Sequence, residues 1–92
     1  MDRKEIEKIN LRSLEKWGGK LQLIKTSEEC SELIQSISKY LIDQGDIDSI
    51  KEEIADVFII VRQLRTLFGK KEIDEIIDKK MKIVIDKIEG DD

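Results

Sequence analysis

The sequence predicts an all-α protein, an antiparallel four-helix bundle-like domain, on three observations. Apolar residues recur every three or four positions, glycines at positions 18, 19, 45 and 69 separate the periodic segments, and proline is absent. Charged residues make up 41% of the chain and aromatic residues 4%, a composition that favours helices over sandwiches or barrels. Ninety-two residues allow one domain, residues 1–92, whose own core is small, so an oligomer is expected.

The first two helices are predicted over residues 3–17 and 20–43. Asp2 is positioned to cap the first helix, and Gly18-Gly19 interrupts the helical pattern. The second helix is expected to end before Gly45, which suits a left-handed cap. The apolar residues that define the inward side of the second helix are Ile24, Cys30, Leu33, Ile34, Ile37 and Leu41.

The third and fourth helices are predicted over residues 49–68 and 71–89. Asp46 or Asp48 is positioned to cap the third helix, and Gly69 ends it. The inward side of the third helix carries Ile50, Ile54, Val57, Val61, Leu64 and Phe68. The inward side of the fourth carries Ile73, Ile76, Ile77, Val84 and Ile88. Short connections between long amphipathic helices favour antiparallel neighbours, and therefore a bundle.

The charge balance and the missing residue types narrow the function classes. A net charge of −4 argues against nucleic acid as a partner, and no apolar stretch approaches the roughly 18 residues of a membrane span. The N-terminal segment lacks the apolar run of a signal peptide, and Cys30 has no second cysteine to pair with, so a cytoplasmic location is expected. Histidine is absent, which removes the commonest general base and the commonest transition-metal ligand.

Four carboxylates occupy positions that border or enter the apolar sides of two consecutive helices. At about 100° per residue, Glu53 falls inside the apolar sector of its helix and Asp56 at the edge of that sector. Glu29 and Glu32 flank the apolar sector of the preceding helix, whereas Glu28 points to solvent. Facing each other in a hairpin, the two pairs need protonation or a cation, and an oxygen-only ligand set favours Mg²⁺ or Mn²⁺. The alternative is an ordinary solvated helix face.

Basic and aromatic residues offer further candidates for a binding site. Lys80 and Lys87 project into the apolar sector of the fourth helix, either because their aliphatic stems lie along the bundle edge or because they bind anionic groups. Lys79 and Lys82 point outward. Trp17 either stacks on a base or continues the apolar side of the first helix, and packing is the preferred interpretation.

Two motifs make the chain resemble a known family. "EECSE" (28–32) followed by "EIAD" (53–56) is similar to the E-E-x-x-E … E-x-x-D signature of MazG-like all-α nucleoside triphosphate pyrophosphohydrolases. The similarity extends over roughly residues 16–89. The resemblance implies that Glu29, Glu32, Glu53 and Asp56 are Mg²⁺ ligands. It also implies cleavage of a (d)NTP between the α- and β-phosphates, giving a nucleoside monophosphate and pyrophosphate, by a homodimer or homotetramer.

The fourth helix departs from the family pattern, in which a Lys is followed by two Arg, or by an Asn and an Arg. Lys80 matches the first position and Lys87 replaces the last, whereas the middle position falls on Ile83 or Val84. A lysine supplies a point charge without the bidentate fork of arginine, so weaker phosphate positioning is expected.

The expected mechanism assigns a role to each candidate residue. Glu29 or Glu53 is expected to serve as the general base, since no histidine is present to do so. Lys80 and Lys87, with Lys25 as a further candidate, are expected to neutralise charge on the β- and γ-phosphates. Two alternatives remain at this point: a non-catalytic helical interaction or regulatory module, and a related-fold enzyme such as a dUTPase or a phosphoribosyl-ATP pyrophosphohydrolase.

Overall fold

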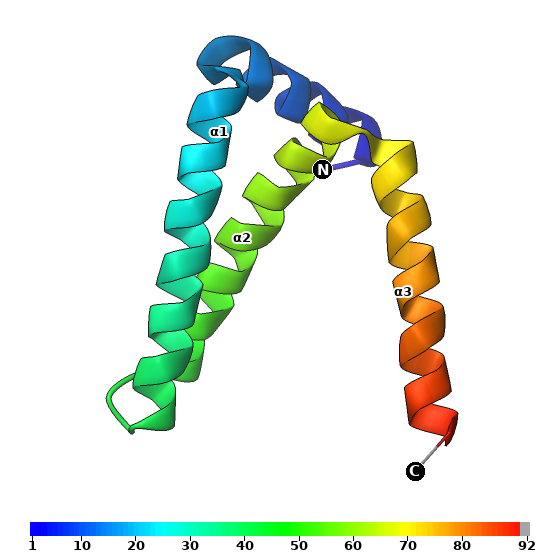
Figure 1. The fold of residues 1–92 in the computed structure, drawn as a ribbon. Coiled ribbons are helices and arrows are strands. Elements are labelled where there is room, and N and C mark those ends of the chain that lie inside the picture. The colour runs from blue at the N-terminus through cyan, green and yellow to red at the C-terminus, as the bar shows by residue number, and fades with distance from the viewer. Residues whose placement is uncertain (91–92) are drawn as a thin grey trace.

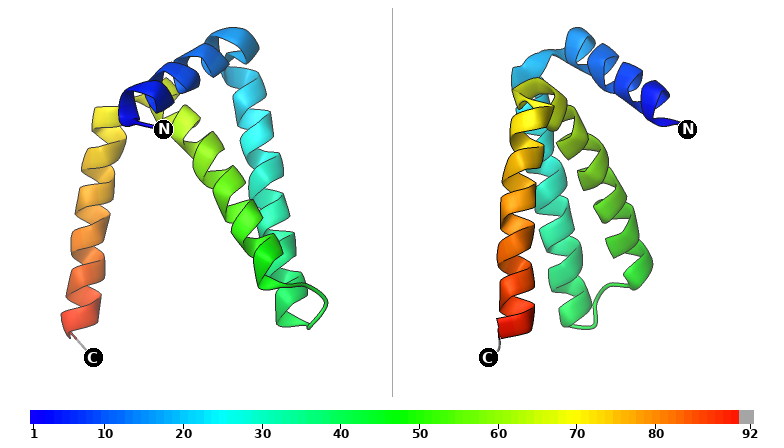
Figure 2. Two further views of the ribbon diagram at one scale, coloured as in Figure 1. Left: turned by 180° about the vertical axis from the view of Figure 1, so that it is seen from behind. Right: turned by 90° about the vertical axis from the view of Figure 1, so that its right-hand side faces the viewer.

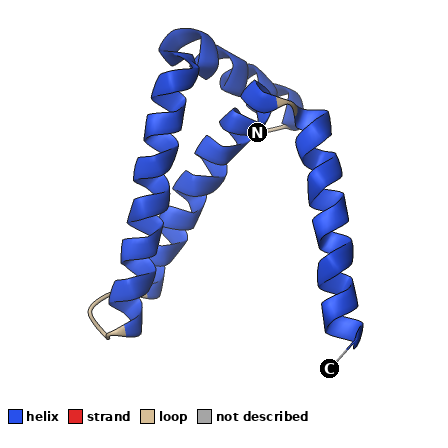
Figure 3. Cartoon of the chain, in the orientation of Figure 1, coloured by secondary structure: helices blue, strands red, loops and turns tan. Residues whose placement is uncertain are grey.

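Two aspartate caps and a sharp turn at a glycine divide the chain into its helices. The computed structural model describes residues 1–90, which form three helices and no strand: α1 (Arg3–Leu41), α2 (Ile47–Phe68) and α3 (Lys70–Gly90) (Figures 1 and 3). The predicted all-α class is therefore confirmed. No helix within residues 1–90 combines the length and the apolar content that crossing a membrane requires.

The helix N-termini follow from side-chain capping. Asp2 Oδ1 accepts a hydrogen bond from the backbone N–H of Glu5 at 2.9 Å, and Asp46 Oδ1 accepts one from Ser49 at 2.7 Å. Both caps satisfy a backbone N–H that has no partner within the helix. Asp46 rather than Asp48 is thus the cap of α2, which begins two residues before the predicted start.

The turn between α1 and α2 differs from the sequence prediction. Gly45 was expected to adopt the left-handed conformation, but Asp43 does so instead, with φ of 59°. Asp tolerates this conformation better than most residues because its short polar side chain can bond locally. The prediction for Gly45 is wrong, and the reason for glycine there is space: a Cβ would lie 3.1 Å from Lys39 Cβ.

Gly18 bends α1 instead of ending it. Residues 3–17 and the rest of α1 form two arms that correspond to the first two predicted helices, and Gly18 between them has φ 78° and ψ 160°. This combination of angles is accessible almost only to glycine. Gly19 lies against the C-terminal end of α2, where an added Cβ would stand 3.0 Å from Leu67 Cδ2.

Replacing Gly18 by alanine is expected to destabilise the fold. A Cβ at φ 78° is strained whatever the surrounding space, and the expected loss is about 1–3 kcal/mol in the free energy of unfolding. Urea denaturation followed by circular dichroism measures it. Gly90→Ala is the control, because a Cβ at Gly90 meets no atom within 4 Å and should leave stability unchanged. A Gly18→Ala protein as stable as the wild type would show that the bend is not a strained element.

The second arm of α1 and α2 pack side by side as an antiparallel hairpin, whereas α3 stands away from it (Figures 1 and 2). Gly69, with φ of 116°, turns the chain between α2 and α3. Two ion pairs fix the start of α3: Arg65 holds Asp74, with its Nε donating to Oδ1 at 2.8 Å, and Lys70 Nζ lies 3.3 Å from a Glu7 carboxylate oxygen on the first arm. These contacts connect α3 to the end of α2 and to the first arm of α1.

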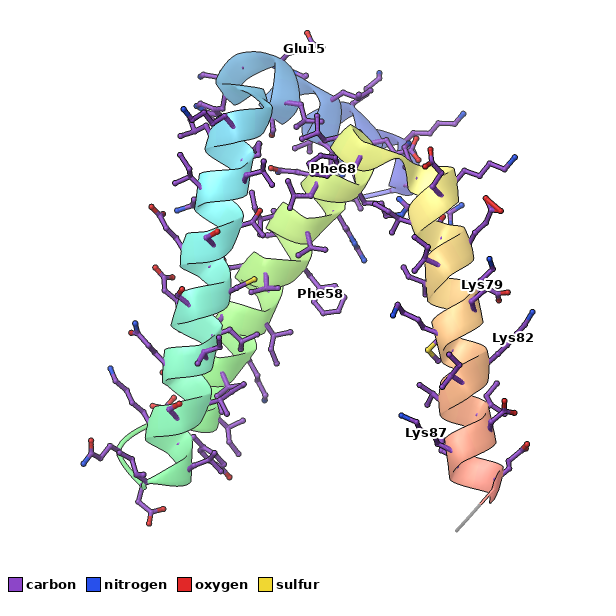
Figure 4. The ribbon with its side chains drawn as sticks, in the orientation of Figure 1. Glu15, Phe58, Phe68, Lys79, Lys82 and Lys87 are labelled. Carbon is purple, nitrogen blue, oxygen red and sulfur yellow. The ribbon has the colours of Figure 1, made fainter. Side chains whose placement is uncertain are left out.

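The hairpin and α3 leave most apolar side chains exposed. Ile60 is the one apolar side chain of residues 1–90 that is buried, and α3 has no buried residue. Phe58 is 59% exposed and projects from α2 on the side that faces α3 (Figure 4). The radius of gyration is 16.1 Å, against about 12 Å for a typical domain of this length. The four predicted helical segments therefore do not close into a four-helix bundle within one chain, because nothing among residues 1–90 covers the apolar side of α3.

Candidate metal centre

Three carboxylates converge where α1 and α2 face each other. Glu29 on α1 and the pair Glu53 and Asp56 on α2 each offer one carboxylate oxygen, and these three atoms all lie within 4.8 Å of one another. The pair on α2 shares one side of the helix because its members are three residues apart. The antiparallel hairpin brings Glu29 opposite that side, as the sequence spacing predicts.

The environment of Glu29 and Glu53 is drier than that of surface acids, whereas Asp56 is exposed. Glu29 is 7% exposed and Glu53 is half-buried, and Oε2 of each is buried without a hydrogen-bond partner. A buried carboxylate oxygen that lacks a partner is costly, since it has given up water and gained nothing in exchange. The two unpartnered oxygens thus mark positions that a cation would satisfy.

One protein cation offsets part of this charge. Lys25 Nζ lies 3.0 Å from Glu29 Oε1 and 3.7 Å from Glu28 Oε2. The hydrogen bond to Glu29 and the charge of that carboxylate raise the pKa of Lys25. Lys25 therefore balances Glu29, but no ion pair joins a lysine or arginine to Glu53 or Asp56 within residues 1–90.

Glu53 is the carboxylate whose pKa is raised by burial and by this uncompensated negative charge. Burial raises its pKa, and so do the neighbouring carboxylates of Glu32 and Asp56, a hydrogen bond with Glu32 and the charge of Glu29. Glu32 is exposed and lies outside the group of three, yet it is close enough to act on Glu53. Glu28 is exposed, as predicted. All four carboxylates named from the sequence thus meet in one region of the hairpin.

A cavity of about 410 Å³ opens beside the carboxylates. Charged residues at one end of it are Lys25, Glu28, Glu29 and Asp56. The remaining lining residues are Trp17, Leu21, Gln22, Ile24, Ile59, Ile60 and Gln63. The site therefore joins a polyanionic region to a mainly apolar hollow along the same hairpin.

Two lining residues escaped the sequence prediction. Gln22 is 4% exposed and Gln63 is 7% exposed, although glutamine usually lies at the surface. Each stands seven residues from a carboxylate of the cluster, Gln22 before Glu29 and Gln63 after Asp56. Seven residues make about two helical turns, so this spacing puts each amide on the same side of its helix as the acid. This seven-residue spacing is the feature of the sequence that could have identified the two glutamines as lining residues.

The remaining predicted site residues divide into two groups. Trp17 is half-exposed and lines the cavity, with the Lys16 ammonium 5.4 Å from the centre of its ring. Lys80 and Lys87 are exposed on α3, which meets α1 at its start through the Lys70–Glu7 ion pair but does not approach the arm of α1 that carries Glu29, so one chain does not bring them to the carboxylates. Figure 4 shows Lys87 on the side of α3 that faces the hairpin, and Lys79 and Lys82 on the opposite side, as predicted.

The geometry defines an all-α protein with an oxygen-only cluster suited to a hard divalent cation, set at the wall of a small cavity. Residues 20–90 match the family model described as the MazG nucleotide pyrophosphohydrolase domain. The chain belongs to this family, and the resemblance drawn from its two acidic motifs is confirmed. Searches of curated proteins and of solved structures return no match.

Proposed function

We propose that this protein is a Mg²⁺-dependent nucleoside triphosphate pyrophosphohydrolase, for which Mn²⁺ can substitute. It would cleave a (d)NTP between the α- and β-phosphates and release a nucleoside monophosphate and pyrophosphate. The observation that carries the proposal is the pair of buried, unpartnered oxygens, Glu29 Oε2 and Glu53 Oε2, within one carboxylate cluster. Membership of a nucleotide pyrophosphohydrolase family supports the reaction class.

The residues present fit the expected metal ion. Glu29, Glu53 and Asp56 would hold it, with Glu32 beside them, and their oxygens match the preference of Mg²⁺ for hard ligands. Bound Mg²⁺ would neutralise phosphate charge and acidify water at this site. Because the carboxylates repel one another, the folded protein is expected to bind the ion more tightly than any isolated acid would.

The chain's own side chains supply the remaining chemistry. Glu29 or Glu53 would accept a proton from the attacking water through a carboxylate oxygen that does not hold the metal ion. The water oxygen bonds to the α-phosphorus while the bond from that phosphorus to the bridging oxygen breaks, and pyrophosphate leaves. Lys25, at the cavity wall, would offset charge on the β- and γ-phosphates.

We further propose that a second copy of the chain covers α3 in a homodimer or homotetramer. The chain exposes 7512 Å², whereas a folded monomer of this size typically exposes about 5,500 Å². The excess of about 2,000 Å² exceeds the roughly 800 Å² that one partner buries in a standard interface. Both unmatched surfaces, the apolar side of α3 and the side of α2 around Phe58, are on the same chain, so two copies can cover each other.

A charge on the apolar side of α3 is expected to break this assembly. Val84→Glu would bury a carboxylate against the partner, so the dimer should dissociate at micromolar concentration and the chain should lose helicity. Sedimentation equilibrium and circular dichroism measure the two effects. Lys79→Glu changes a residue on the opposite side of α3 and is the control that should stay assembled. A wild-type chain that is folded and monomeric would contradict the proposal.

The reaction itself is tested with a panel of canonical and modified nucleoside triphosphates and Mg²⁺, scored for pyrophosphate against orthophosphate. Pyrophosphate and the monophosphate in equal amounts support the proposal, and the preferred substrate separates a general pyrophosphohydrolase from a dUTPase. Orthophosphate alone would overturn it. Calorimetric titration with Mg²⁺ or Mn²⁺ covers the remaining alternative, because a non-catalytic interaction module should show no specific divalent site.

A further inference from the structure

The metal and phosphate chemistry leaves one end of the cavity without a role. Gln22 is more than nine-tenths buried there, and its Nε2 is buried with no hydrogen-bond partner. Gln63 from α2 lines the same cavity and is also almost fully buried. An amide that loses water without gaining a partner destabilises the protein, so a bound molecule that pairs with it would recover that loss.

The cavity has two chemically different ends along the axis of the hairpin. Gln22 and Gln63 each lie about two helical turns, roughly 10 Å along the helix axis, from Glu29 and Asp56 respectively. The charged lining residues gather near the carboxylates, whereas the amide end is walled by apolar side chains and by the half-exposed Trp17. The cavity volume of about 410 Å³ suits a small molecule. A ligand laid along the hairpin therefore meets acids at one end, and amides with an aromatic ring at the other.

We infer that the amide end is a nucleobase pocket, in which Gln22 and Gln63 bond the hydrogen-bonding edge of the base and Trp17 stacks on its face. This inference rests on the proposed function, which puts the phosphates at the carboxylate end. An amide both donates and accepts, and so can match the paired donors and acceptors of a base edge. A neutral planar ring also suits an apolar wall and an indole. The pocket therefore discriminates between bases instead of accepting all of them.

The single tryptophan gives a direct measurement of binding. Trp17 is the only tryptophan of the 92 residues and lines this pocket, so tryptophan fluorescence comes from one side chain at the proposed site. The full-length protein with Mn²⁺ is titrated with the four common nucleoside monophosphates and with ribose 5-phosphate, which has no base. The preferred monophosphate is expected to shift the Trp17 emission and to bind at least about tenfold more tightly than ribose 5-phosphate, as one stacked base allows.

The amide is tested by Gln22→Met, which removes the hydrogen-bonding group and keeps a long unbranched side chain. The differences in affinity among the four bases should fall by about tenfold, while binding of pyrophosphate with Mg²⁺ stays unchanged. Gln35→Met, an exposed glutamine of α1 outside the cavity, is the matched control. Gln63→Met repeats the test from α2 in case Gln22→Met does not fold. An unchanged ranking of the bases in both cavity variants would overturn the inference.

The failure of this inference is distinguishable from the failure of the proposed function. Base-dependent binding by a protein that releases no pyrophosphate would uphold the pocket and reject the hydrolase. Ribose 5-phosphate that binds as tightly as every monophosphate would reject the pocket, whether or not pyrophosphate is released.

Discussion

Glu53→Gln is expected to lower Mg²⁺-dependent pyrophosphate release by at least about 100-fold while the helices persist. The substitution keeps the shape of the side chain and removes the charge at the position where the carboxylates of the cluster are least compensated. The rate of pyrophosphate release and the far-ultraviolet circular dichroism spectrum are the two measurements. A variant that hydrolyses nucleotides at the wild-type rate would show that the metal assignment is wrong.

The same variant should be more stable than the wild type when divalent ions are absent. The pKa of Glu53 is raised above its ordinary 4.5, which means that folding disfavours the charged form. At pH 7 the wild type therefore carries a cost that the amide avoids. That cost disappears as the pH falls through the raised pKa, so the melting temperatures should converge in acid. Added Mg²⁺ should stabilise the wild type and leave Glu53→Gln almost unchanged.

Glu52→Gln is the matched control for these measurements. Glu52 precedes Glu53 on the same helix, undergoes the same chemical change, and is exposed. It should retain full activity, the wild-type response to Mg²⁺ and an unchanged melting temperature without it. A loss of activity in Glu52→Gln equal to that of Glu53→Gln would mean that net charge, and not the cluster, governs the reaction.

The carboxylate cluster could be predicted because it depends on local rules alone. Helical spacing puts Glu53 and Asp56 on one side of α2, and a short turn between long helices makes α1 and α2 antiparallel neighbours. This antiparallel pairing places Glu29 of α1 opposite the two carboxylates of α2. The helix starts could also be predicted from the sequence. Asp2 and Asp46 cap their helices by accepting a hydrogen bond from the backbone N–H three residues later.

The direction of α3 could not be predicted because it depends on contacts between distant residues. A glycine at position 69 indicates that a helix ends but not where the next helix points, and α3 contacts distant residues through the ion pairs of Arg65 with Asp74 and of Lys70 with Glu7. The bend at Gly18 is similar: the sequence marks the break but does not give its angle, nor does it show that Gly19 lies against Leu67 of α2.

Gln22 and Gln63 were missed for a different reason. An uncharged polar side chain fits a helix surface as well as a cavity wall, so no misplaced charge draws attention to it. Only the two-turn spacing from Glu29 and Asp56 sets these glutamines apart. Burial, which the sequence does not reveal, makes them candidates for the site.

Complementation between two impaired variants is the second prediction with a large effect. Lys80 and Lys87 lie on α3, away from the carboxylates of their own chain, so their proposed contact with phosphate requires a partner's carboxylate cluster. Lys87→Ala is expected to lower kcat/KM at least about tenfold, through loss of a charge-assisted hydrogen bond to phosphate. In a mixed dimer with Glu53→Gln, one site combines the intact Glu53 of one chain with the intact Lys87 of the other.

Refolding the two variants together should therefore raise activity above that of either variant alone. Random pairing makes half of the dimers mixed, each with one intact site of two, so about one quarter of the wild-type activity is expected. A mixture of Glu53→Gln with Glu29→Gln is the control. Glu53 and Glu29 belong to the cluster of a single chain, so every site in that mixture keeps a defect and no activity returns. A mixture of Glu53→Gln and Lys87→Ala that assembles but gains no activity over the separate variants would show that α3 does not complete the site of a second copy.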